Sequence, residues 1–74
     1  MITVKVVSQS SGNPVKGADV SLSFDGFSRG VTDRESTDSN GEAHFNADNG
    51  SGQVYVNGST KHRGNLSGRI VIYV

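Results

Sequence analysis

The sequence contains no cysteine and no tryptophan, only one proline, and no apolar run of the roughly 18 residues that a membrane-spanning helix needs. Without cysteine there is no disulfide, no thiolate nucleophile and no cysteine-ligated metal site, and the redox compartment stays open. No basic stretch followed by an apolar run is present at the beginning, so we expect no signal peptide and no membrane insertion. Both a cytosolic protein and a domain excised from a longer chain fit these absences, which leaves localisation open.

An excess of charge is also missing, because seven basic and seven acidic residues give a formal net charge of zero. Nucleic-acid-binding proteins usually carry a concentrated basic surplus, so we predict no nucleic-acid partner. The acidic residues all lie between positions 19 and 48, whereas the last third of the chain holds only basic ones. This asymmetry would suit contact with a partner or with a second copy, unless folding mixes the two sets.

Helical periodicity is absent as well, and alternation of apolar and polar residues with a period of two takes its place. The alternation runs through 2–7, 18–24, 42–45 and 53–56, while 69–74 is apolar on both faces and indicates a strand that is covered on both sides or lies at an interface. In the last segment Ile70, Ile72 and Val74 share one face, and Val71 and Tyr73 share the other. The residues predicted to face a core in the other segments are Ile2, Val4, Val6, Ala18, Val20, Leu22, Phe24, Ala43, Phe45, Val54 and Val56.

Turn-forming residues separate these runs. There are ten glycines, and the Asn-Gly pairs at 40–41, 49–50 and 57–58 favour the positive φ angles of tight hairpin turns. The polar segment 28–37 is predicted to be an exposed or edge strand, on which Arg29, Arg34 and Glu35 would discourage pairing between edges. Together these signals predict a single all-β domain over 1–74, with six or seven short, mainly antiparallel strands arranged as a sandwich or an open barrel.

Three blocks of the sequence, GNPVKGADVSLSF, TDSNGEAHF and GQVYV, resemble the carboxypeptidase regulatory-like domains, the collagen-adhesin B-type repeats and related transthyretin-like sandwiches. The positions that carry the resemblance are Pro14, Val15, Gly17, Ala18, Val20, Leu22, Thr37, Asp38, Gly41, Phe45 and Gly52, with Val54 or Tyr55. The resemblance covers roughly residues 1–57 and rests on structural positions. It implies a small Greek-key-like (prealbumin-like) sandwich and an accessory, spacer or adhesion role as part of a larger protein, and fold alone does not fix function.

Catalytic and metal-binding patterns are weak. Some B-type repeats carry an isopeptide bond, but Lys5 points to the polar face by alternation, and the last predicted strand offers no Asn or Asp to receive it. Two histidines, His44 facing outward on a strand and His62 in a loop, do not supply the three or four ligands of a zinc site. No nucleophile elbow and no phosphate-cradling loop occur. We therefore predict no enzyme, no cofactor and no metal centre.

One alternative to the absence of metal is a weak surface calcium site formed by Asp33, Glu35 and Asp38. The simpler interpretation of DSNG at 38–41 is a turn in which Asp38 and Asn40 bond their own backbone.

The long polar stretch 58–68 exceeds an ordinary hairpin loop, and long loops on rigid β scaffolds often bind ligands. Its Lys61, His62 and Arg63 are candidates for holding a carboxylate or phosphate. The alternative, which we favour, is a solvated loop or a strand extension with alternating polar residues.

These patterns predict a non-enzymatic structural or protein-interaction module, an accessory domain of a larger surface or assembly protein or a small self-associating protein. Exposed strand edges would offer main-chain pairing, with outward-facing Tyr55 and Tyr73 as aromatic anchors. The alternative function is a small binding domain for an anionic glycan, peptide or phosphate through the basic stretch 58–68.

Overall fold

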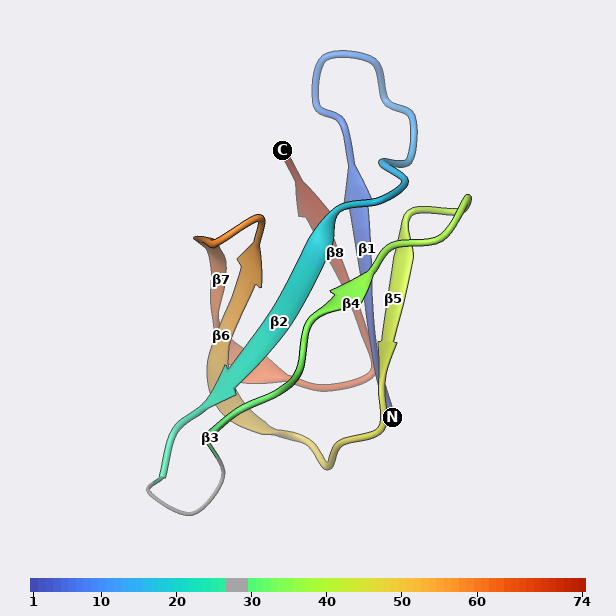
Figure 1. The fold of residues 1–74 in the computed structure, drawn as a ribbon. Coiled ribbons are helices and arrows are strands. Elements are labelled where there is room, and N and C mark those ends of the chain that lie inside the picture. The colour runs from blue at the N-terminus through green and yellow to red at the C-terminus, as the bar shows by residue number, and fades with distance from the viewer. Residues whose placement is uncertain (27–29) are drawn as a thin grey trace.

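The computed structural model describes residues 1–26 and 30–74, and these residues form strands, turns and loops without a helix (Figure 1). No helix that could cross a membrane is therefore found among them. The strands are β1 (Ile2–Val7), β2 (Asp19–Phe24), β3 (Gly30–Val31), β4 (Glu35–Ser36), β5 (Glu42–Phe45), β6 (Gly50–Val56), β7 (Ser59–Leu66) and β8 (Arg69–Tyr73).

The strands form two sheets. The first has the order β5-β1-β8, and the second has the order β3-β2-β6-β7, with β4 also pairing with β2. β1 and β8 run parallel, and the other pairings between the described strands are antiparallel. The prediction of an all-β chain is thus confirmed, and two sheets with apolar inner faces are compatible with a small sandwich.

The core lies between the two sheets and follows the predicted alternation. Ile2, Val4 and Val6 of β1 are fully buried, and the inward residues of β2, β5 and β6 join them in one cluster. Of the last strand, Ile70 and Ile72 join the core, whereas Val74 beyond it is 40% exposed. Leu66, which follows a run of polar residues, was not predicted to be buried, yet it is fully buried and belongs to the core.

The Asn-Gly pairs behave differently from one another. Asn57 and Gly58 have φ angles of 52° and 86° and form the two-residue turn of the β6–β7 hairpin, as predicted. Gly41 also has a positive φ, of 74°, in the turn before β5. The pair 49–50 was wrongly expected to form a hairpin turn, because there the chain passes from β5 in one sheet to β6 in the other.

The structure corrects two segment predictions and the strand count. In place of one edge strand over 28–37 there are two two-residue strands, β3 and β4, which bring the described strands to eight; Ser28 and Arg29 lie outside the described residues. The stretch 58–68 is not a loop. Most of it is β7, which pairs along the whole of β6, so the interpretation as a strand extension is confirmed.

Thr37 connects two of the four places where the chain changes sheet. It lies between β4 and β5, and its buried hydroxyl donates a hydrogen bond to the carbonyl of Val15 (2.6 Å) in the β1–β2 connection. The same oxygen accepts the backbone N–H of Ala18 (2.9 Å), and the backbone N–H of Thr37 donates to the Ala18 carbonyl. The first two blocks of the sequence resemblance therefore meet at one buried polar side chain.

We expect Thr37→Val to lower the free energy of unfolding by about 1–3 kcal/mol, because the isosteric side chain leaves the partly buried Val15 carbonyl and the buried Ala18 N–H without their partner. Thr37→Ser keeps the hydroxyl and is the matched control, with a smaller loss from the missing methyl group. Urea denaturation measures both variants. Equal midpoints for Thr37→Val and the wild type would show that the two hydrogen bonds contribute nothing to stability.

Candidate functional site

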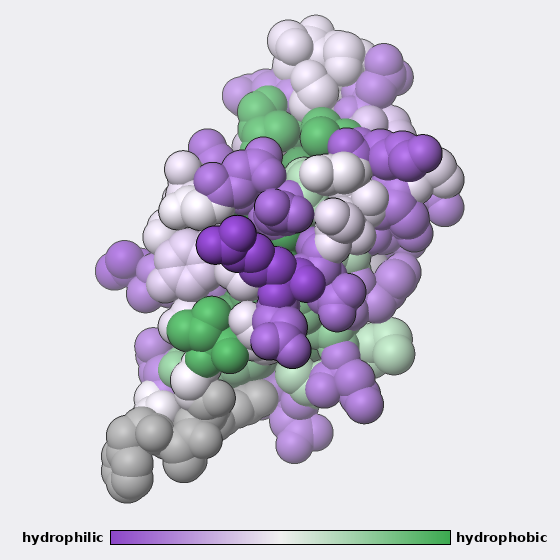
Figure 2. All heavy atoms as spheres, viewed as in Figure 1, coloured by the Kyte–Doolittle hydropathy of each residue, from purple (hydrophilic) through white to green (hydrophobic). Residues whose placement is uncertain are grey.

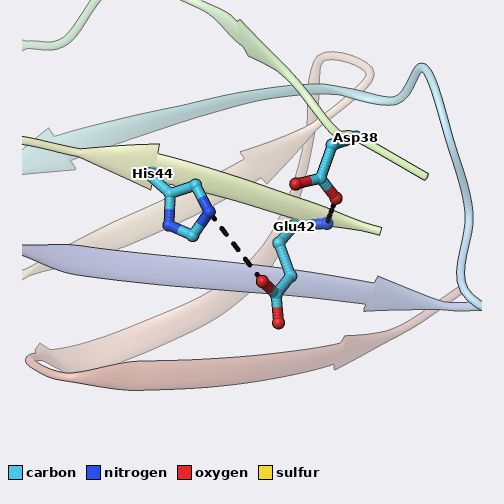
Figure 3. Close-up of side chains that lie close together, drawn as sticks. All are labelled: Asp38, Glu42 and His44. Atoms are coloured by element: carbon cyan, nitrogen blue, oxygen red, sulfur yellow. Dashed lines mark hydrogen bonds and ion pairs between the residues drawn. The ribbon is translucent and has the colours of Figure 1, made fainter. Parts of the chain in front are cut away.

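Three side chains that can bind a metal ion or exchange protons gather at one end of β5 (Figure 3). Asp38 lies in the turn before the strand, and Glu42 and His44 are two residues apart on β5, so both project from its outer face. One ligand atom from each of the three lies within 4.8 Å of the others. The turn 38–41 folds Asp38 back over the beginning of β5, since the N–H of Asp38 donates to the Glu42 carbonyl.

Each member of the Asp38–Glu42–His44 cluster is held by a group outside the cluster's side chains. One carboxylate oxygen of Asp38 accepts the backbone N–H groups of Asn40 (2.9 Å) and Glu42 (3.0 Å). The Nδ1 atom of His44 is hydrogen-bonded to the hydroxyl of Thr3 (2.9 Å), which lies directly opposite on β1. The guanidinium of Arg69 reaches across β1 from β8 and binds Oε2 of Glu42 at 2.7 Å.

These contacts leave one heteroatom of each side chain directed toward the others. Oε1 of Glu42 lies 3.8 Å from Nε2 of His44. The second oxygen of Asp38 points toward His44 (Figure 3). Glu42 has a side chain that is only 18% exposed, whereas that of His44 is 49% exposed. The cluster is therefore an ordered set of two carboxylates and one imidazole, open to solvent on one side.

The surroundings of Asp38 favour the charged form of its carboxyl group. The pKa of Asp38 lies below its ordinary value chiefly because the backbone N–H of Glu42 donates to the carboxylate. Partial desolvation opposes this shift, while the N–H of Asn40 and the nearby imidazole of His44 lower the pKa further.

The residues predicted for ligand binding do not converge. Lys61 is the extra residue of an irregularity between the 54–62 and 55–60 pairs, His62 lies opposite Val54 of the inner face, and Arg63 lies opposite Gln53 of the outer face. Because neighbouring strand residues point to opposite faces, His62 and Arg63 are directed to different sides of the second sheet. An anion-binding role for Lys61, His62 and Arg63 stays a prediction that this arrangement does not strengthen.

The structure also bears on the predicted calcium site of Asp33, Glu35 and Asp38. The structure places Asp38 with Glu42 and His44, and it does not bring Asp38, Asp33 and Glu35 together as a group of possible ligands within the described ranges. The interpretation of DSNG as a turn holds, because Asp38 bonds the backbone N–H of Asn40.

A second surface feature is a hollow of about 420 Å³ on the outer face of the second sheet. It is lined by Asp19, Ser21, Arg34, Tyr55, Asn57 and Gly58. Figure 2 shows that the face on which β2 and β4 lie toward the viewer is covered mostly by polar side chains. Tyr55 is half-buried in this hollow, whereas Tyr73 on β8 is 62% exposed.

Comparison of the chain with models of protein families, with curated proteins and with solved structures found no match. The assignment of a function therefore depends on the geometry of the chain itself.

Sequence reasoning missed the cluster, although its elements were visible. The outward direction of Glu42 and His44 and the turn at Asp38 were each predicted from the pattern. The signal that combines them is an Asp that closes a turn, followed by Glu and His on one face of the next strand. Thr3 and Arg69 come from β1 and β8, which no local pattern connects to β5.

We expect the Asp38 carboxylate to make folding pH-dependent. A carboxyl group whose pKa is lowered by folding stabilises the native state above the ordinary value of 3.8, and this contribution disappears as the pH falls through the lower pKa of the folded state. Asp38→Asn should therefore unfold at lower urea concentration than the wild type at pH 7, and the difference should shrink below about pH 4.

The matched control is Asp33→Asn, which replaces an exposed carboxylate that makes no hydrogen bond within the described part of the chain. A constant difference between Asp38→Asn and the wild type from pH 7 to pH 2 would refute the assigned role of the carboxylate.

Proposed function

We propose that this chain is a non-enzymatic interaction module that accepts an extended strand from a partner at the free edge of β8. The observation that supports this proposal is the pairing of β8, which is bonded on one side to β1 and pairs with no other described strand on the other side. A strand added there would continue the first sheet through main-chain hydrogen bonds.

The direction of the backbone groups defines which residues would receive the strand. The N–H of Val74 donates to Val7, and the carbonyl of Val74 accepts from Gln9, so both groups of Val74 face β1 and the segment that follows it. Since main-chain groups alternate along a strand, those of Ile72 and Ile70 also face β1. The N–H and C=O groups of Arg69, Val71 and Tyr73 consequently face outward at the edge.

The side chains at this edge suit a protein contact. Val71 and Tyr73 project from the outer face of the first sheet and are 42% and 62% exposed, and Val74 beyond them is 40% exposed. The sequence interpretation that 69–74 is a strand at an interface is supported by this exposure. Tyr73 would serve as the aromatic anchor, because tyrosine buries a large area and keeps a polar hydroxyl.

The edge of the second sheet at β7 has features that natural proteins use against strand addition, and the edge at β8 lacks most of them. β7 carries Lys61 and Arg63, contains Gly64, and is interrupted by the irregularity at Lys61. Charges and bulges on an edge discourage pairing with other chains. β8 has a single charged residue, Arg69, and its pairing with β1 is regular over five residues, so it is the more receptive of the two edges.

A second copy of the chain is one partner that fits the β8 edge. In an antiparallel pair centred on Val71, the outward main-chain groups of Arg69, Val71 and Tyr73 would meet those of the second copy. Arg69 would lie opposite Tyr73 of the second copy in the register, and Ile70 would lie opposite Ile72, while the Arg69 guanidinium stays bound to Glu42.

The broader assignment follows the sequence resemblance. An accessory, spacer or adhesion role within a larger surface or assembly protein is supported by the structural nature of the shared positions, which include Thr37 and Gly41. The Greek-key-like (prealbumin-like) topology is part of the same proposal, and two sheets with one core are compatible with it.

Val71→Lys tests the proposal, because a charge at the centre of the edge opposes strand addition and would place two ammonium groups opposite each other in a symmetric pair. We expect the wild type to associate with rising concentration in sedimentation velocity, and Val71→Lys to weaken the association by about tenfold or more. Val31→Lys is the matched control, because Val31 is a more exposed valine on the other sheet.

Hydrogen exchange provides the second measurement. The amides of Arg69, Val71 and Tyr73 should become protected as the protein associates or when a synthetic peptide of residues 68–74 is added. A wild type that stays monomeric, with fast exchange at these three amides in the presence of the peptide, would contradict the proposal.

A further inference from the structure

The Asp38–Glu42–His44 cluster has the organisation expected of a metal-binding site in its metal-free state. In metal centres, the atom of a ligand that does not bind the metal is usually hydrogen-bonded to another group, which fixes the ligand's orientation. Here that condition holds for all three side chains. Backbone N–H groups occupy one oxygen of Asp38, Arg69 occupies Oε2 of Glu42, and Thr3 occupies Nδ1 of His44.

The remaining atoms are close enough for one ion to bind them together. Oε1 of Glu42 and Nε2 of His44 lie 3.8 Å apart, and one ligand atom from each of the three side chains lies within 4.8 Å of the others. Ligands bound to one zinc ion at about 2.0–2.2 Å lie roughly 3.3 Å apart. Small rotations of these side chains would close the difference, because His44 and Asp38 are exposed on one side. The Nδ1–Thr3 contact holds the imidazole with Nε2 toward Glu42.

We infer that Asp38, Glu42 and His44 form a binding site for a divalent first-row transition-metal ion, with Zn²⁺ as the ion used to test it. One imidazole nitrogen with two carboxylate oxygens is a ligand set that suits zinc and its neighbours, whereas Ca²⁺ and Mg²⁺ favour oxygen ligands alone. Three protein ligands leave at least one position for water, so the ion would be accessible from solvent.

Two positive side chains limit the affinity of this site. Arg69 is bound to Glu42, and Lys5 lies opposite Glu42 on β1. Removing the guanidinium should therefore strengthen the binding of Zn²⁺ to the cluster. If the cluster served only to pair charges, the same removal would weaken the cluster instead. Arg69→Gln thus distinguishes a metal site from a surface ion-pair network.

The experiment is a titration of the untagged, ¹⁵N-labelled protein with ZnCl₂, followed in heteronuclear NMR spectra at a concentration where the chain is monomeric. We expect saturable shifts centred on residues 38–44 and Thr3. His44→Ala should weaken Zn²⁺ binding by about tenfold or more, and Thr3→Val, which leaves the ligands in place, should weaken it by roughly tenfold. Arg69→Gln should bind Zn²⁺ more tightly than the wild type.

His62→Ala is the matched control, because it removes the other histidine, on β7, which is not part of the cluster. Its Zn²⁺ affinity should equal that of the wild type. The inference is overturned if Zn²⁺ shifts no resonance of residues 38–44 at millimolar concentration, if both histidine variants lose affinity equally, or if Ca²⁺ produces the same shifts at the same concentration. Backbone spectra of the metal-free variants confirm that each one is folded.

Discussion

The buried hydroxyl of Thr37 is the polar contact that joins two of the connections between the sheets. The chain leaves the first sheet after β1 and leaves the second sheet after β4, and at both crossings the backbone needs hydrogen-bond partners that no strand supplies. The Thr37 hydroxyl provides them for the first crossing, through Val15 and Ala18, and the backbone bonds of Thr37 with Gly17 and Ala18 hold the second crossing beside it. Gly41 completes the arrangement, because any side chain there would meet the carbonyl of Val6 and the ring of Pro14. The turn that carries Asp38 is consequently fixed against the core.

Much of the core could be predicted because alternation is a local property. A strand with one buried face has apolar residues at every second position, and β1, β2, β5 and β6 pack their apolar residues inward as their sequences indicate. Leu66 was missed because it is a lone apolar residue after polar ones, and only the pairing of β7 with β6 carries it into the core. Segment 28–37 lacks alternation, so its division into two short strands follows from their separate pairing with β2.

The candidate site was harder to predict from the sequence, because its geometry depends on residues that are far apart in the chain. Asp38, Glu42 and His44 are close in the chain, but what orients them comes from elsewhere. Thr3 stands opposite His44 only in the register of β1 with β5, and Arg69 reaches Glu42 only because the last strand runs parallel to the first. Register and strand order are set by the packing of the whole domain, so no window of sequence contains them. The same dependence explains the basic stretch 61–63, where strand formation directs His62 and Arg63 to different faces, although a loop could have kept them together.

The parallel pairing of β1 with β8 also determines how the domain would respond to tension. The two ends of the chain lie toward opposite ends of the first sheet (Figure 1), and the strands beside them are joined to each other directly. A pull on both ends would slide β1 and β8 along one another, so their five residue pairs would bear the load together rather than opening one after another. Rupture under force is governed by the unfolding rate, and a shared load raises the barrier to that first step. This geometry would suit a domain placed in series in a protein that carries mechanical stress.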